Sequence, residues 1–250
     1  MKSALIAYRV AWELTRDPTL KILFISSTSN LATKQLKFIK DILTCDNYSI
    51  LWPEMVNREE TKREKWTERE ISVDDPRRKA ESVREPSVFT AGLTTNIVGL
   101  HCDICVLDDV VVSGNAYTED GREKVKDQYG LLSSVEHVGA REWVVGTRYH
   151  PDDLYAQLLE IAYDHEDEHG RVTSQTPMFE RNTDYGIPET VESIGDGSGE
   201  FLWPRQQRYD GKWFGFNREA LATKKKQYLN QTHFRAQYYN DPHDVGASVF

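Results

Sequence analysis

The feature that most constrains the fold is a short apolar run that ends in two adjacent acids. Residues 104–107 read Ile-Cys-Val-Leu, Asp108 and Asp109 follow, and three valines come next. An apolar run without alternation is typical of a strand that is buried on both faces of a parallel sheet. Open α/β sheets bind ligands at the carboxyl ends of their strands. The run therefore predicts an α/β fold whose acids lie at the carboxyl edge of the sheet.

These two acids have two interpretations. A carboxylate at the end of a buried strand is costly unless a cation meets it. One acid can hold Mg²⁺ on a phosphate ligand while its neighbour orients a water molecule, which is the pattern of a Walker B strand. The alternative is a strand that ends in a solvated Asp-Asp turn, and the run alone does not decide between them.

The composition is that of an ordinary globular protein with one large α/β domain, or with a domain and a small appendage. Of the 250 residues, 39% are hydrophobic and 28% are charged, and no apolar run approaches the roughly 20 residues that span a bilayer. We therefore expect no membrane partner. The three cysteines suit a reducing cytosol. Cys102 and Cys105 are interpreted as packed thiols, because their spacing along a strand points them to opposite faces and no second pair completes a zinc site.

Helix and strand patterns alternate along the chain, which predicts a parallel sheet covered by helices. The strand at 142–147 is expected to be buried like the one at 104–107. The charged stretch 58–79 is expected to be a solvated helix or a mobile insertion, and 181–200 a loop. The predicted helices are 4–16, 31–43, 118–133, 151–163, 217–228 and 231–239, and the other predicted strands are 21–26, 87–92 and 171–175.

Charge is distributed unevenly. The net charge is −9, yet residues 203–250 hold eight Lys or Arg against four acids. Binding to phosphates depends on local positive charge more than on net charge, so this segment is a candidate for nucleic-acid contact. Solvated helix faces produce the same excess of basic residues.

Lys2 and Ser3 are a second candidate piece of a site. A phosphate-binding loop ends in Gly-Lys-Ser/Thr at the start of a helix, where Lys reaches the β- and γ-phosphates and the hydroxyl takes Mg²⁺. Here a Lys-Ser pair begins an amphipathic helix, but the glycine-rich half does not precede it. A Lys-Ser pair by itself has no diagnostic value. Its place, one helix before a buried strand and ahead of the two acids, favours the phosphate-binding interpretation.

Thr147 and Arg148 are the third piece. They follow a strand that comes after the acidic strand and its helix, so both strand ends can lie at one sheet edge. A threonine hydroxyl there can sense a γ-phosphate, and Arg148 can offer it positive charge. The alternative is an ordinary turn with a surface arginine.

Taken together, these segments resemble the ATPase domain of the large terminase subunit of tailed bacteriophages. The resemblance covers nearly the whole chain, and its most specific parts are 146–155 and 237–242. The segments that carry it are 2–3 with the helix that follows, 87–92, 99–109, 146–155 and 235–242.

The resemblance implies a P-loop NTPase of the ASCE, RecA-like kind, with a mostly parallel sheet covered by helices on both faces. It implies an ATP- and Mg²⁺-dependent motor in the host cytoplasm that pumps double-stranded DNA into a procapsid. The motor would form a ring of identical subunits on the portal protein and work with a small terminase subunit. Residues 1–202 would be the ATPase core and 203–250 a helical subdomain.

The resemblance also implies roles for single residues. Lys2 and Ser3 would match the end of Walker A and bind the nucleotide, and Ser3 and Asp108 would hold Mg²⁺. Asp109 would polarise the attacking water. Thr147 would couple loss of the γ-phosphate to movement, with Arg148 beside it.

The sequence departs from the family pattern in several places. The catalytic position is often Glu, whereas Asp109 is one methylene shorter. Val98 stands where some members carry an arginine that acts on a neighbour's nucleotide, which leaves Arg148 and Arg84 as candidates. The first strand and most of the phosphate loop would lie upstream of Met1. A nuclease domain would follow 247–250, so we expect no nuclease activity from this chain and an uncertain affinity for ATP.

Two other functions stay open. One is another P-loop DNA-dependent ATPase, such as a helicase or repair motor, although 250 residues leave no room for a second motor lobe. The other is a catalytically inactive remnant that binds DNA or protein and whose acids are structural. Stabilisation that requires both Mg²⁺ and an ATP analogue would distinguish an ATPase from such a module.

Overall fold

The computed structural model describes residues 2–97, 99–180 and 190–243. Val98, the segment 181–189 of the predicted loop and the predicted strand start at 247–250 lie outside these described residues. The chain divides into two compact units, each described by itself below. The first comprises Met1–Val110 with Glu123–Gly146, and the second Val111–Arg122 with Thr147–Phe250. These bounds differ from the predicted division after residue 202, which stays a prediction.

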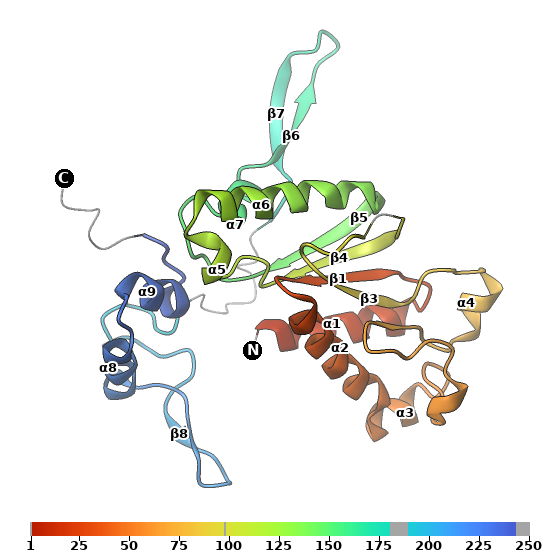
Figure 1. Cartoon of the computed structure of the whole chain (residues 1–250), viewed down its shortest axis with the longest axis horizontal. Helices are drawn as coiled ribbons and strands as arrows, with labels where there is room; N and C mark the ends of the chain where they lie inside the picture. Colours follow the sequence, from red (N-terminus) through yellow and green to blue (C-terminus); the bar gives the residue numbers. More distant parts are fainter. Residues whose placement is uncertain (1, 98, 181–189, 244–250) are drawn as a thin grey trace. The chain divides into compact units, whose positions relative to one another are not determined.

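A five-stranded sheet forms the centre of the first unit (Figure 1). Four of its strands run parallel, and only β2 runs antiparallel, against β3. In spatial order the strands are β2 (Glu70–Ile71), β3 (Val88–Gly92), β1 (Ile22–Ser26), β4 (Cys102–Asp108) and β5 (Glu136–Val145). The predicted mixed α/β architecture with a mostly parallel sheet is therefore confirmed.

Helices lie on both faces of this sheet (Figure 1). On one face, α1 turns Ala7, Val10 and Leu14 toward the sheet at helical spacing, and all three side chains are fully buried. The helices that belong wholly or partly to this unit are α1 (Lys2–Arg16), α2 (Ser29–Thr44), α3 (Asp46–Leu51), α4 (Pro76–Ala80) and α6 (Glu119–Gly130), with 3-10 turns at Glu60–Lys62 and Leu131–Ser134.

The register of the parallel strands sets the position of the site. Ser26 at the end of β1 is paired with Gly92 of β3 on one side and with Asp108 of β4 on the other. The α1 helix precedes β1 and runs back along the sheet, so its first residues lie at this same carboxyl edge. The α2 helix also begins there, where the Thr28 side chain accepts a hydrogen bond from the Leu31 N–H and caps the helix.

Two expectations for the first unit need correction. The stretch 58–79 is not a single solvated helix, because only its last residues belong to the α-helix α4. It is also joined to the core, because it contributes the edge strand β2 and buries Ile71 and Val73. The strand predicted at 142–147 is the longer β5, and its residues are exposed or half-buried because β5 is an outer strand of the sheet. Both expectations failed because pairing at a sheet edge is decided by tertiary contacts.

The two thiols of β4, Cys102 and Cys105, are free and buried, as expected of packed thiols. The pairing of β4 with β5 is irregular beside Cys102, because more residues of β5 than of β4 lie between the pairs Cys102–Glu136 and Ile104–Arg141. The orientation of the two thiols toward opposite faces stays a prediction.

The second unit is built from short elements around an aromatic cluster. Phe234 and Leu221 are buried at its centre, and Phe216, Tyr228 and Tyr238 pack against them. Its elements are α5 (Ser113–Ala116), α7 (Leu154–Leu158), β6 (Ala162–Glu166), β7 (Val172–Pro177), β8 (Gln206–Gln207), β9 (Trp213–Phe214), α8 (Arg218–Gln227) and α9 (Gln231–Tyr239).

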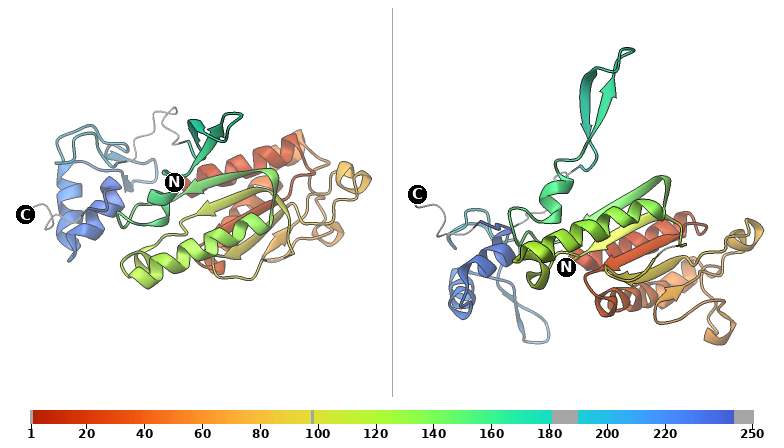
Figure 2. Two further views of the ribbon diagram at one scale, coloured as in Figure 1. Left: turned by 90° about the horizontal axis from the view of Figure 1, so that it is seen from above. Right: turned by 45° about the horizontal axis from the view of Figure 1, so that its top comes forward.

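The helix predicted at 151–163 is much shorter than expected. Only α7 is helical, and residues 162–166 form β6, which pairs with β7 in an antiparallel hairpin that is drawn as a two-stranded ribbon in Figure 2. Pro151 and Asp152 precede the helix. Asp153 is its N-cap and accepts a hydrogen bond from the Ala156 N–H. The predicted strand at 171–175 and the two helices near 217–228 and 231–239 are present. Within the described ranges, no helix is long and apolar enough to cross a bilayer.

Candidate functional site

Ser3 and Asp108 meet at the carboxyl edge of the sheet. The Ser3 hydroxyl, in the first turn of α1, donates a hydrogen bond of 2.9 Å to Oδ1 of Asp108, the last residue of β4. The two residues are 105 positions apart in the sequence, so the fold creates this contact. It brings together a hydroxyl and a carboxylate, which are two oxygen ligands of the kind that Mg²⁺ prefers.

Lys2 lies at the same edge. Its ammonium group donates a hydrogen bond to the carbonyl oxygen of Gly146, the residue directly after β5. Lys2 also lowers the pKa of both Asp108 and Asp109, so its charge acts on the two acids. Four of the six predicted site residues, Lys2, Ser3, Asp108 and Asp109, therefore lie together within the first unit.

The two acids hold more negative charge than their surroundings neutralise. Burial, with repulsion from Asp109, raises the pKa of Asp108 to about 6 against the opposing effects of Ser3 and Lys2. Burial also raises the pKa of Asp109 above its ordinary value. A buried carboxylate and a half-buried one beside one ammonium group favour a further cation.

Asp109 has an unusual backbone. Its φ is +48°, in the left-handed region, where Asp is one of the few residue types other than glycine that are found. Its N–H still donates a 2.8 Å hydrogen bond to the carbonyl oxygen of Val145, so the chain leaves the sheet only at this residue. Such conformations cluster at functional sites. The turn also separates the two side chains, because Asp108 keeps the strand geometry and Asp109 does not.

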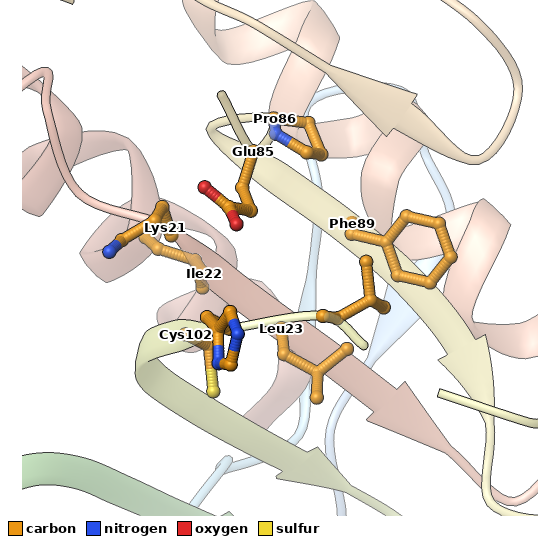
Figure 3. A pocket seen from close by; sticks show the side chains of 9 residues that line it. Lys21, Ile22, Leu23, Glu85, Pro86, Phe89 and Cys102 are labelled. Carbon is orange, nitrogen blue, oxygen red and sulfur yellow. The ribbon is translucent and has the colours of Figure 1, made fainter. Parts of the chain in front are cut away.

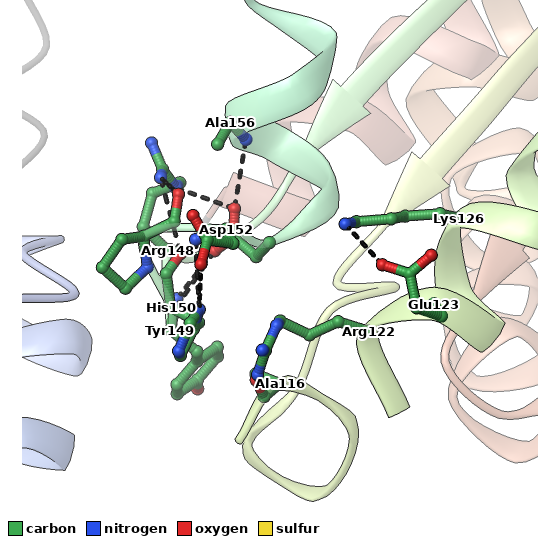
Figure 4. Close-up of polar contacts among 11 residues, drawn as sticks. Ala116, Arg122, Glu123, Lys126, Arg148, Tyr149, His150, Asp152 and Ala156 are labelled. Carbon is green, nitrogen blue, oxygen red and sulfur yellow. Dashed lines mark hydrogen bonds and ion pairs between the residues drawn. The ribbon is translucent and has the colours of Figure 1, made fainter. Parts of the chain in front are cut away.

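Thr147 and Arg148 belong to the second unit, and their predicted roles toward a phosphate stay predictions. Thr147 is buried. Arg148 makes a 2.9 Å ion pair with Oδ1 of Asp153, and its guanidinium also donates to the carbonyl oxygen of Pro151 at 3.0 Å (Figure 4). Asp153 is fully buried. The guanidinium of Arg148 thus stabilises the turn before α7, so a phosphate would have to compete with Asp153 for it.

Two polar groups of these turns do not stand out in the sequence. Asp153 accepts hydrogen bonds from the backbone N–H groups of Tyr149 and Ala156 and organises the 148–153 turn; an Asp just before a helix was the available signal. Ser26 is paired in register with Asp108, and only the register of the sheet reveals this.

The residues at the carboxyl edge fit a magnesium ion with a phosphate ligand. In the part of the chain that the structure describes, no group of three or more His, Cys, Asp or Glu residues is arranged to hold a metal by itself. A metal at Asp108 would therefore rely on Ser3, water and ligand phosphates, which suits Mg²⁺ and does not suit a structural zinc.

Two hollows of the first unit lie at the opposite, amino-terminal edge of the sheet. One is a cavity of about 10 Å³ lined by Lys21, Glu85 and Phe89 (Figure 3), which holds one water at most. The other is an open groove of about 540 Å³ to which Arg84 and Arg141 contribute. Neither coincides with the acids. Arg84 is exposed at this edge, away from Asp108 of its own chain, so its predicted action on a neighbour's nucleotide stays a prediction.

Comparison with known proteins gives one informative relative. No family model matches the chain. The chain is 32% identical over 209 residues to the large terminase subunit of Enterobacteria phage T3, and the match covers 78% of the chain and 32% of that protein. The chain thus spans about a third of the length of this curated relative. The resemblance to the large terminase subunits is thereby confirmed, and the chain is related to them over most of its length.

Proposed function

We propose that this chain forms the ATPase motor of a phage large terminase, with a P-loop NTPase core that hydrolyses ATP to drive double-stranded DNA into a procapsid. The observation that carries the proposal is the Ser3–Asp108 hydrogen bond at the carboxyl edge of the parallel sheet. It pairs the hydroxyl expected at the end of Walker A with the acid expected at the end of Walker B.

Each residue of the edge has a chemical task in this proposal. When bound, Mg²⁺ supplies positive charge to the β- and γ-phosphates. Ser3 and Asp108 hold it, and the Lys2 ammonium neutralises phosphate charge. Asp109 accepts a hydrogen bond from the attacking water and orients it. The shorter side chain of Asp109, compared with Glu, places this water closer to the end of β4.

The remaining parts of the proposal follow from the family resemblance. Thr147 would report loss of the γ-phosphate to the second unit, and Arg148 or Arg84 would act on nucleotide, the latter on a neighbour's. The partners would be double-stranded DNA, a portal protein and a small terminase subunit, around a ring of identical copies in the host cytoplasm.

The proposal is tested by nucleotide-dependent stabilisation. The melting temperature of the chain is measured with Mg²⁺ alone, with a non-hydrolysable ATP analogue alone, and with both. We expect a rise only with both, since a ligand at 100 times its Kd adds about 2.7 kcal/mol to stability. Lys2→Ala should remove the rise, whereas Lys34→Ala, an exposed lysine of α2, should keep it. An equal rise without Mg²⁺, or none, would contradict the proposal.

A further inference from the structure

Ser26 carries a buried hydroxyl that no other described group satisfies. The residue is 1% exposed, and among the described residues its Oγ has no hydrogen-bond partner. A buried hydroxyl without a partner costs about 1–3 kcal/mol. Such groups are rare in native proteins, and each calls for a partner outside the ordinary contacts of the fold.

The hydroxyl stands beside the candidate metal ligand. Ser26 and Asp108 are paired in register on neighbouring parallel strands. Side chains alternate along a strand, and Phe24 and Val106, two residues earlier on each strand, both belong to the core cluster that α1 covers. Ser26 and Asp108 therefore project from the same face of the sheet, toward the first turn of α1 and Ser3.

The hydroxyls on the other side of Ser26 are already engaged. Gly92, its partner on β3, has no side chain. The Gly92 N–H donates to Oγ of Ser29 at 3.2 Å and to Oγ1 of Thr95 at 3.1 Å, and these two hydroxyls lie 3.2 Å apart. The polar groups on the Gly92 side thus bond to one another, and Asp108 is the polar side chain paired in register with Ser26.

We propose that Ser26 is a positioning residue of the magnesium site, whose hydroxyl oxygen accepts a hydrogen bond from a water ligand of the ion held by Ser3 and Asp108. This inference rests on the proposed function. Mg²⁺ keeps several of its waters in protein sites, and groups that hold those waters orient the ion without touching it. Ser3 from α1 and Ser26 from β1 would then act from two elements on one metal site, Ser3 as a ligand and Ser26 through a water.

The test separates metal-free stability from magnesium dependence. Ser26→Ala and Ser26→Cys remove the hydroxyl, and Cys also keeps the volume of the site. We expect the melting temperature of the metal-free chain to stay unchanged or rise, because an unsatisfied donor is removed. With a saturating ATP analogue, the Mg²⁺ concentration for half-maximal stabilisation should rise about 10- to 100-fold.

Ser87→Ala is the matched control. Ser87 is also fully buried, but its Oγ accepts a 2.9 Å hydrogen bond from the Val73 N–H at the far edge of the sheet. Its removal should lower the metal-free melting temperature and leave the Mg²⁺ dependence unchanged.

The outcomes separate this inference from the proposed function. Absence of any Mg²⁺-dependent shift in the unsubstituted chain would overturn the proposed function and this inference together. A normal shift that keeps its Mg²⁺ dependence in Ser26→Ala would overturn this inference alone. A lower metal-free melting temperature in both variants would also overturn it, because Ser26 would then have a partner within the protein.

Discussion

At the scale of single residues, Asp108 and Asp109 are neighbours in sequence with different environments. Asp108 is 3% exposed, ends the strand and accepts a hydrogen bond from Ser3. Asp109 stands in the left-handed region just outside the sheet. Burial and mutual repulsion keep the Asp108 carboxyl easier to protonate than usual, and a bound cation would reverse this effect.

The raised pKa of Asp108 predicts a stability difference that depends on pH. In the metal-free chain the pKa of Asp108 in the folded state, about 6, exceeds the ordinary 3.8. The contribution of this carboxyl to stability is therefore fully present below pH 3.8 and is lost as pH rises through 6. Asp108→Asn should therefore stabilise the metal-free chain at pH 8, by at most about 3 kcal/mol, and have little effect at pH 4. Urea unfolding at both pH values measures this. Destabilisation at pH 8 would mean that the fold already neutralises the carboxylate.

Asp109→Asn should separate binding from catalysis. Asn tolerates a positive φ as Asp does, so the fold and nucleotide binding should persist. Turnover of ATP should fall at least about 100-fold, the usual contribution of a positioned general base. Phosphate release and analogue-induced stabilisation are measured in parallel. Loss of the stabilisation with the turnover would assign Asp109 to folding or binding instead.

The proximity of some candidate residues could be predicted because their chemistry is visible in their type and order. A Lys-Ser pair before a helix and two acids after a buried strand were sufficient to predict that Ser3 and Asp108 share one sheet edge. Ser26 was predicted only as the last residue of the strand at 21–26, because a serine is informative when its burial and its strand neighbours are known. The roles of Thr147 and Arg148 stay predictions.

At the scale of elements, local signals predicted the parts that form the centre of the first unit. The helix α1, the strands β1, β3 and β4 and the helix α2 follow from apolar runs and from spacing of 3.6 residues. The short strand β2 and the early end of α7 were missed. A strand of two residues, or a helix of five, depends on its packing partners more than on its own pattern.

Where β3 meets the start of α2, adding one methyl group to Gly92 should lower the stability of the fold. A Cβ on Gly92 would lie 2.6 Å from the backbone nitrogen of Ser29, which cannot move without shifting the start of α2. Gly92→Ala should lower stability by about 1–3 kcal/mol, the usual cost of an overpacked site. Gly130→Ala is the control, because a Cβ there meets nothing within 4 Å. Equal melting temperatures for the two variants would show that α2 adjusts freely.

At the scale of the whole molecule, charge decides where a polyanion can bind. The chain carries a net charge of −9, so attraction to DNA would have to come from a local surface. Helix α8 offers one, since Lys224, Lys225 and Lys226 are consecutive and exposed in its last turn. Composition predicted this basic segment, whereas the two compact units and their bounds depend on contacts that composition does not specify.

Neutralising this turn should weaken DNA binding in a salt-dependent way. Each lost phosphate contact flattens the slope of log K against log salt by about 0.9. Gln substitutions at Lys224, Lys225 and Lys226 should therefore reduce both affinity and slope, as measured by fluorescence anisotropy with duplex DNA at several salt concentrations. The matched control replaces three exposed lysines of the first unit, Lys34, Lys37 and Lys79. An unchanged slope in the α8 variant would mark its lysines as a solvated face.

The outermost strand, β5, leaves one flank of the sheet able to pair with a further strand. Within the described ranges, its outer flank has no hydrogen-bonded neighbour, so peptide groups there are free to take up one more strand. A strand added in parallel would finish level with Val145, next to the carbonyl that Lys2 contacts. A loop that followed such an added strand would lie beside Lys2 and Ser3. Backbone N–H groups of that loop could donate hydrogen bonds to an anion there.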